Sequence, residues 1–243
     1  AGDFTTLGTA VDDNIFRPRL ADRNELAQPL PRALNIGYRG NKWGFRAGVQ
    51  SFEWGLGILS NDGLGQTRFG AAHQGNTYVR VGGYSLPAER FPGLSLFAAT
   101  DLVLRDDSAS IYAGDVATQA IFGVRSQAED LEWGALLALR HQQDRPDPFR
   151  PVPDSSSMVT PIDGYARWQP LNGLWLEGEA ALISGSTDRI YSEQTRGEDA
   201  KLQATGLMLQ LAPTEKPEAE SAIWASGIAG FASGDNNPTD GVA

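Results

Sequence analysis

The chain has 243 residues, a formal net charge of -10 and no cysteine. The acidic balance excludes a domain-wide basic surface and with it a nucleic-acid partner. The lack of cysteine excludes disulfides, thiolate metal sites and cysteine nucleophiles, and two histidines are too few for the usual zinc or iron sites. No apolar run of about 18 residues occurs, so no segment is typical of a membrane-spanning helix.

The first 32 residues are rich in Asp, Asn, Arg and Pro. Pro18, Pro29 and Pro31 interrupt any long helix or strand in this part of the chain. We therefore expect residues 1–32 to form a loop or a segment inserted into the lumen of a barrel. Residues 33–243 are expected to form a single β-barrel domain.

Strict alternation of apolar and polar residues begins at Trp43 and continues to Ser51. One face of this strand is apolar and aromatic, and the other carries Gly, Arg and Gln, because successive side chains of a strand point to opposite faces. A shorter strand over 34–39 precedes it across a Gly-Asn turn at 40–42. The two segments therefore predict a β-hairpin.

Eight more strands are predicted along the chain, which makes about ten in all. They cover residues 77–86, 94–104, 116–126, 131–143, 162–169, 174–184, 201–212 and 222–232. Short turns alternate with long polar loops between them, and strand lengths are near the roughly 9–11 residues of a transmembrane β-strand. This rhythm favours an all-β fold, an antiparallel transmembrane β-barrel with short turns at one rim and long loops at the other, over a soluble sandwich.

Ionisable side chains recur in the strand middles on one face, which would line the lumen of a barrel while the apolar face contacts lipid. In a soluble sandwich the apolar face would instead be the core. The predicted lumen and selectivity residues are Arg46, Arg80, Arg125, Arg140, Arg167, Glu177 and Glu179. We expect the arginines to attract carboxylated or phosphorylated solutes. The alternative is that they pair with Asp101, Glu177 or Glu179 and only fill the lumen.

Residues 235–241 carry oxygen ligands at the close spacing that calcium sites require. Asp235, Asn237 and Asp240 are the candidate Ca²⁺ ligands, and no other cofactor is predicted. A solvated turn is the alternative, because the run lacks the glutamate that completes an EF-hand loop. Asp106 is expected to be an exposed loop acid.

The sequence lacks the signatures of an active site, so we expect no enzymatic activity. Glu177 and Glu179 stand two apart on one strand, as paired catalytic carboxylates can, but two lumen-facing acids are the simpler interpretation. No G-x-S-x-G elbow accompanies His73 or His141. The glycines in 55–57 are not followed by the helix that a phosphate loop needs.

Two segments of the chain have a distinctive composition. Residues 50–63, QSFEWGLGILSNDG, place a glycine-flanked tryptophan after a strand with Arg and Gln. Residues 231–241, FASGDNNPTDG, contain Ser-Gly-Asp-x-x-Pro-x-Asp after a late strand. Both segments resemble the alginate-export porin family of bacterial outer-membrane barrels, and the resemblance implies a channel that exports polysaccharide. Members of that family continue beyond the second segment into further strands, so we expect this chain to be part of a larger barrel.

These observations together predict a bacterial outer-membrane channel for passive diffusion or export of polar, anionic solutes such as acidic saccharides. Its surroundings would be outer-membrane lipid and lipopolysaccharide. One alternative is a non-conducting structural barrel that binds partner proteins of an envelope complex, plugged by residues 1–32. Another is a soluble β-rich binding module. Conductance in planar bilayers, co-purification with partners and solubility without detergent distinguish the three.

Overall fold

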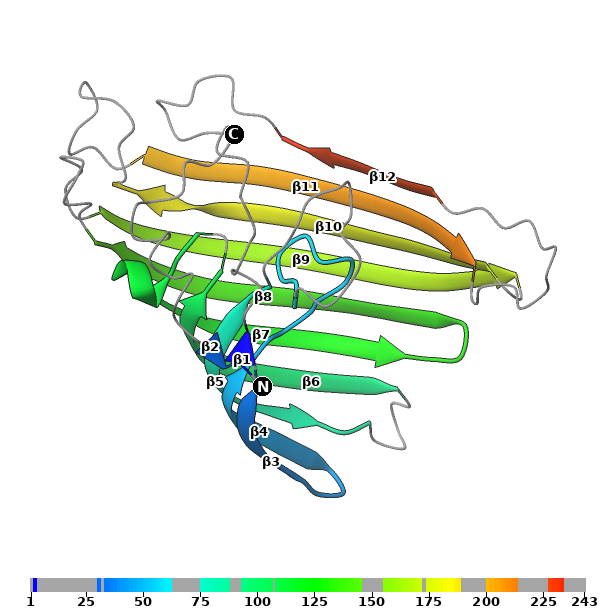
Figure 1. Ribbon diagram of the computed structural model, residues 1–243. Coiled ribbons are helices and arrows are strands. Elements are labelled where there is room, and N and C mark those ends of the chain that lie inside the picture. The colour runs from blue at the N-terminus through cyan, green and yellow to red at the C-terminus, as the bar shows by residue number, and fades with distance from the viewer. Residues whose placement is uncertain are drawn as a thin grey trace.

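The structure is a computed structural model that describes residues 2–3, 30–31, 33–62, 75–87, 93–106, 108–145, 155–171, 174–188, 200–213 and 227–233. Ten strands form one curved antiparallel sheet, in which each strand lies beside the strand that precedes it and the strand that follows it in the chain (Figure 1). The prediction of an all-β antiparallel fold is therefore confirmed. No helix in the described parts of the chain is long and apolar enough to cross a membrane.

The strands of the large sheet are β3 (Leu34–Arg39), β4 (Trp43–Gln50), β5 (Thr77–Ser85), β6 (Leu94–Arg105), β7 (Val116–Gln127), β8 (Leu131–Asp144), β9 (Ser155–Leu171), β10 (Leu174–Thr187), β11 (Ala200–Pro213) and β12 (Gly227–Ala232). A separate pair of two-residue strands consists of β1 (Gly2–Asp3) and β2 (Leu30–Pro31), and η3 (Ile111–Ala113) is a short 3-10 helix. Apart from these strands, the predicted segment 1–32 lies outside the described residues.

The observed strand bounds agree with the predicted ones to within one residue for most of the sheet. The largest difference is in β9, which begins at Ser155 and not at residue 162. Three consecutive serines and Pro161 hide this first half in the sequence because they resemble a loop. The segment is nevertheless a strand, since it pairs with β8 on one side and β10 on the other.

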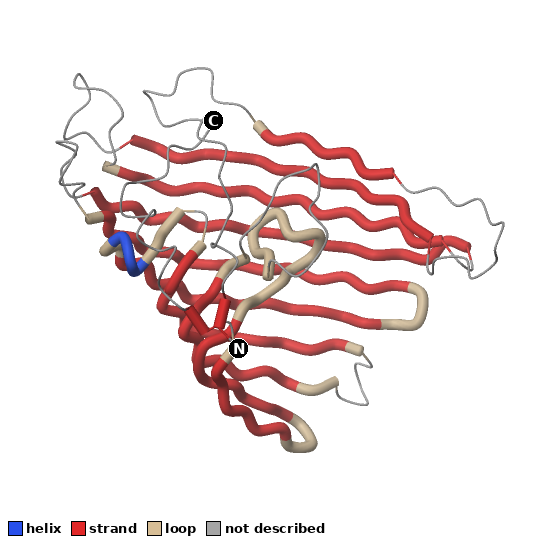
Figure 2. Tube along the Cα trace, viewed as in Figure 1, coloured by secondary structure: helices blue, strands red, loops and turns tan. Residues whose placement is uncertain are grey.

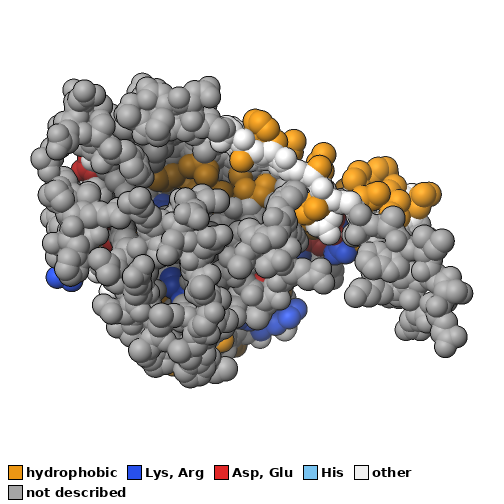
Figure 3. All heavy atoms as spheres, turned by 45° about the horizontal axis from the view of Figure 1, so that its top comes forward, with side chains coloured by type: hydrophobic (Ala, Val, Ile, Leu, Met, Phe, Trp, Pro, Cys, Tyr) orange, Lys and Arg blue, Asp and Glu red, His pale blue; other side chains and the backbone are white. Residues whose placement is uncertain are grey.

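The side chains of the sheet divide cleanly into two faces. On the face that we call the outer face, large apolar side chains predominate. Its well-exposed members are Leu34, Ile36, Tyr38, Trp43, Phe45, Val79, Val81, Leu96, Phe122, Leu131, Trp133, Leu139, Met158, Ile162, Trp168, Leu171, Leu176, Leu182, Leu207, Leu209, Leu211 and Phe231. Figure 3 shows hydrophobic side chains gathered along the part of the sheet that is visible in that view. The apolar face is therefore not covered by the described residues.

The opposite face, which we call the inner face, is polar, and one loop lies against it. Residues 51–62, which we call the inner loop, follow β4 and arch across the sheet in front of its central strands (Figure 2). Two small groups of buried apolar residues lie between this loop and the sheet. The first is built around Trp54 and Leu136, and the second around Tyr78 and Val103. The small core is therefore formed by the inner loop and the sheet.

The connections between the strands differ at the two ends of the sheet. At one end of the sheet, three residues or fewer separate β3 from β4, β7 from β8 and β9 from β10. At the other end, which is on the left in Figure 1, 26 residues separate β4 from β5 and 12 separate β10 from β11. Strand β3 pairs with β4 alone and β12 pairs with β11 alone, so within the described residues these two are edge strands. The ten strands consequently form a sheet with two free edges.

Candidate functional site

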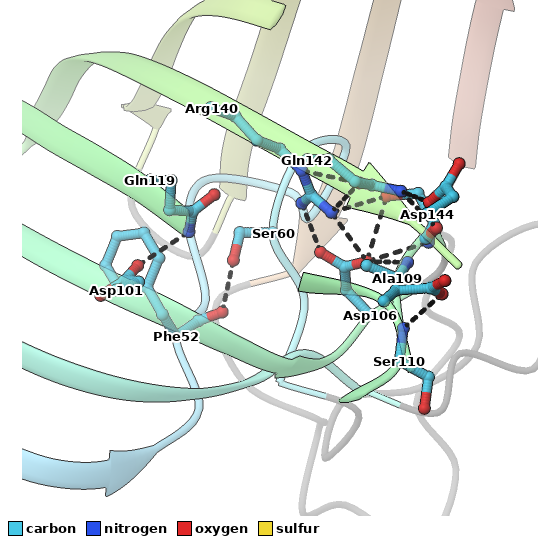
Figure 4. A network of polar contacts seen from close by, with 12 residues as sticks. Phe52, Ser60, Asp101, Asp106, Ala109, Ser110, Gln119, Arg140, Gln142 and Asp144 are labelled. Carbon is cyan, nitrogen blue, oxygen red and sulfur yellow. Dashed lines mark hydrogen bonds and ion pairs between the residues drawn. The ribbon is translucent and has the colours of Figure 1, made fainter. Parts of the chain in front are cut away.

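The inner loop is held in shape by bonds within itself. The backbone N–H of Trp54 donates to the Ser60 carbonyl oxygen over 3.1 Å, and the Ser60 hydroxyl donates to the Phe52 carbonyl oxygen over 2.7 Å, as Figure 4 shows for the second bond. Gly55 has φ 55°, in the left-handed region that favours glycine. A Cβ atom there would also lie 2.7 Å from a carboxylate oxygen of Glu179. Glycine at this position lets the loop approach the sheet closely.

Trp54 is the apolar anchor of the inner loop. Its ring lies 5.7 Å from the ring of Phe97 and 6.3 Å from that of Phe52, measured between centroids. Below it, β8 has a glycine: a Cβ atom at Gly134 would come within 2.7 Å of the indole. The indole N–H donates to Oδ1 of Asp163 on β9 over 2.8 Å. Trp54 thus joins the loop to the sheet through both an apolar and a polar contact.

Glu179 on β10 holds the backbone of the same loop. Its Oε1 accepts a hydrogen bond from the N–H of Ile58 over 3.2 Å, and its Oε2 accepts one from the N–H of Leu56. Asp163 and Glu179 are each only 1% exposed, so both carboxyl groups are covered by the loop. The loop is therefore fastened to two neighbouring strands by acids from the inner face.

Arg80 and Asp101 form a forked ion pair in the middle of the inner face. The distances are 2.6 Å from Nε to Oδ1 and 2.7 Å from Nη2 to Oδ2. Gln119 donates a further hydrogen bond to Oδ2 of Asp101 over 2.7 Å (Figure 4). The guanidinium of Arg80 also lies 4.4 Å from the ring centroid of Phe52. Both charges of this pair are buried, so little of the positive charge of Arg80 reaches solvent.

Arg140 and Asp106 form a second ion pair where β8 reaches the long loops (Figure 4). Asp106 also accepts hydrogen bonds from the N–H groups of Ser108 and Ala109 over 2.9 and 2.8 Å. Burial alone would raise the pKa of the Asp106 carboxyl, but Arg140 and these N–H groups outweigh burial and lower the pKa below its ordinary value. Asp106 is 7% exposed at its side chain, so the expectation of an exposed loop acid is wrong.

The Asp106–Arg140 pair predicts a loss of stability in acid. Because the pKa of Asp106 is lower in the folded chain than the ordinary value of 3.8, the pair contributes its full stability above that pH and loses it as the pH falls below it. In the Asp106→Asn variant, which lacks the titrating group, this part of the acid loss should disappear. Unfolding by denaturant at a series of pH values measures it, and equal pH profiles for both proteins would contradict the assignment.

The other predicted lumen residues lie on the inner face as well. Arg167 pairs with Glu177 over 2.9 Å, and Arg125, which is 48% exposed at its side chain, pairs with Glu132. Arg46 is exposed on β4 and forms no ion pair with a described residue. Four of the five predicted arginines are thus neutralised by a neighbouring carboxylate, Arg80 and Arg167 by acids that the sequence had already suggested. Glu179 binds the inner loop instead of an arginine.

The candidate calcium ligands Asp235, Asn237 and Asp240 lie outside the described residues. Elsewhere, the described ranges contain no group of three or more His, Asp or Glu side chains that could hold a metal ion. The described residues therefore do not test the calcium prediction and contain no alternative metal site.

Trp54 and Asp163 are residues of the candidate site that sequence reasoning missed. Alternation along the strand places Asp163 on the same face as Arg167, so its orientation could have been read from the sequence. Its contact could not, because Trp54 stands 109 positions away in the chain.

No protein-family model, no curated protein and no solved structure matches the chain. The resemblance of residues 50–63 and 231–241 to the alginate-export porins stays a prediction from the sequence.

Proposed function

We propose that the chain forms a bacterial outer-membrane β-barrel channel for polar, anionic solutes such as acidic saccharides. The observation that carries the proposal is the division of the ten-stranded sheet into an apolar outer face and a polar inner face. Soluble proteins rarely expose a continuous apolar patch larger than a few hundred Å². A lipid-facing sheet requires such a surface, since its alternate residues must meet hydrocarbon and a wet lumen.

The lengths and connections of the strands support the same proposal. Strands β6 to β11 have 12 to 17 residues, enough to cross a hydrocarbon layer at a tilt. Backbone groups at membrane depth must all be paired, so the free edges of β3 and β12 each need a partner strand. Closure of the barrel therefore requires these two edges to pair with each other or with additional strands.

Selection of anions would depend on Arg46 more than on the other inner-face arginines. The ion-paired arginines present little net charge, whereas Arg46 is exposed and has no carboxylate partner among the described residues. A guanidinium in this position offers several N–H donors to a passing carboxylate. In the proposed barrel, the inner loop would reduce the width of the lumen through which such a solute passes.

The proposal is tested by planar-bilayer recordings on the refolded chain. We expect conductance and a reversal potential in a salt gradient that favours anions. Arg46→Gln should lower the anion-to-cation permeability ratio about fivefold, since one charge at ~8 Å changes the energies of an anion and a cation by roughly 0.5 kcal/mol each, in opposite directions, in water. Lys42→Gln, which removes a charge from the turn before β4, is the matched control and should change the ratio less.

Two results would contradict this function. A chain that inserts into vesicles but never conducts would favour the structural barrel, and a reversal potential that favours cations would overturn anion selection.

A further inference from the structure

Two buried carboxyl groups meet on the inner face without a cation between them. Asp163 on β9 and Glu179 on β10 are diagonal neighbours, because Asp163 is paired with Ala181 and Glu179 with Tyr165. Both side chains point to the inner face, and each is 1% exposed there. Oδ2 of Asp163 is buried and has no hydrogen-bond partner of its own, whereas Oδ1 accepts the Trp54 indole N–H. The geometry therefore leaves one buried acid oxygen without a partner on the same face as a second buried carboxyl group.

No described arginine or lysine forms an ion pair with Asp163 or Glu179. The ionisable groups that face this acid pair along the neighbouring strands are Tyr165 and Arg167 on β9, Glu177 on β10, Glu132 on β8 and Arg125 on β7. The two arginines in that set are already paired with Glu177 and Glu132. The opposite strand β11 places Gly206 and Met208 beside the pair, and neither residue titrates.

Two ionised carboxylates in contact, away from water and without a cation, repel each other strongly. One proton between them removes this repulsion and gives the unpaired oxygen of Asp163 a partner. The loop donors do not replace it, because the N–H groups of Leu56 and Ile58 bind the two oxygens of Glu179 and the indole of Trp54 binds Oδ1 of Asp163. A divalent cation would need more oxygen ligands than the two carboxyl groups supply.

We propose that Asp163 and Glu179 are positioning residues that hold the inner loop across the inner face by sharing one proton, and that loss of this proton releases the loop. The seated loop keeps both acids away from water, while the released loop lets water solvate each of them. The seated state therefore binds one more proton than the released state, and its stability falls as the pH rises. Widening of the channel on release rests on the proposed channel function, whereas the release itself does not.

The test measures hydrogen exchange of the backbone amides in residues 54–58, in the full chain in detergent micelles or vesicles. Glu179→Gln is the key variant, since its amide nitrogen donates a permanent N–H to Asp163 while its carbonyl oxygen keeps one of the two acceptors for the loop. The ratio of wild-type to Glu179→Gln exchange rates cancels the intrinsic effect of pH. We expect this ratio to rise about tenfold or more between about pH 6 and about pH 10.

Two further variants complete the design. Asp163→Asn supplies the same permanent donor from the other side, so it should also remove the pH dependence, and it replaces Glu179→Gln if that variant does not fold. Glu132→Gln is the matched control: it removes an inner-face acid whose hydrogen bonds go to Arg125 and Gln127 and not to the inner loop. Its exchange should follow the wild-type pH profile.

If the ratio of wild-type to Glu179→Gln exchange rates does not change between about pH 6 and about pH 10, the two acids do not share a proton. Bilayer recordings over the same pH series separate this result from a failure of the channel function. If the exchange ratio rises with pH but the chain never conducts, the role of Asp163 and Glu179 in holding the inner loop stands and the channel function is rejected. If the chain conducts but the ratio of exchange rates does not change with pH, the channel function stands and the shared proton of Asp163 and Glu179 is rejected.

Discussion

Leu182→Arg is expected to lower the free energy of unfolding from a lipid bilayer by about 2–4 kcal/mol. Leu182 lies on the outer face of β10, away from both strand ends, and is 44% exposed. An arginine at this depth would replace an apolar side chain in contact with hydrocarbon by a charge. Denaturant titration of the chain folded into vesicles, followed by tryptophan fluorescence, measures the change.

The matched control for this experiment is Leu131→Arg. Leu131 is 43% exposed on the same face, but it is the first residue of β8 and lies beside the turn at 128–130. An arginine there reaches the interface, so the expected loss is about 0–1 kcal/mol. If both variants change the free energy of unfolding by less than about 0.5 kcal/mol, the outer face is in contact with water and the membrane proposal fails.

Asp101→Ala is expected to cost about 3–5 kcal/mol of folding free energy. The substitution removes the carboxylate that accepts two hydrogen bonds from Arg80 and one from Gln119. It leaves the guanidinium of Arg80 buried without a counter-charge, which is the costly part of the change. The same denaturant titration measures this loss.

Glu132→Ala is the control for Asp101→Ala, because its partner Arg125 is half exposed and such pairs contribute about 0–1 kcal/mol. The double variant Arg80→Met/Asp101→Leu should recover most of the loss, since removing both charges avoids an unpaired one. Equal losses for Asp101→Ala and Glu132→Ala would mean that water reaches the Arg80–Asp101 pair freely.

Most of the sheet could be predicted from the sequence because the alternation is regular. In β7, β8 and β10, apolar residues recur on one face through the middle of the strand and indicate which face each side chain occupies. The first half of β9 could not be predicted. Its serines and Pro161 form a strand only because β8 and β10 supply pairing on both sides.

The candidate site could also be predicted only in part, because alternation within a strand is visible in the sequence and contacts between distant residues are not. Alternation alone puts Arg80, Arg140 and Glu179 on one face. The partners of these residues depend on which strand lies beside them, and the seat of the inner loop depends on contacts more than one hundred positions away. Such contacts leave no periodic signal, so the role of Asp163 and Glu179 could be found only in three dimensions.

The order of strands in the sheet also determines the order of assembly. Every pairing in the ten-stranded sheet joins strands that follow one another in the chain, so the sheet can grow hairpin by hairpin with short loop closures. The inner loop is made early in the chain, yet its binding partners Asp163 and Glu179 come from β9 and β10. It can be seated only after those strands have joined, so closure of the loop over the inner face marks a late step in folding.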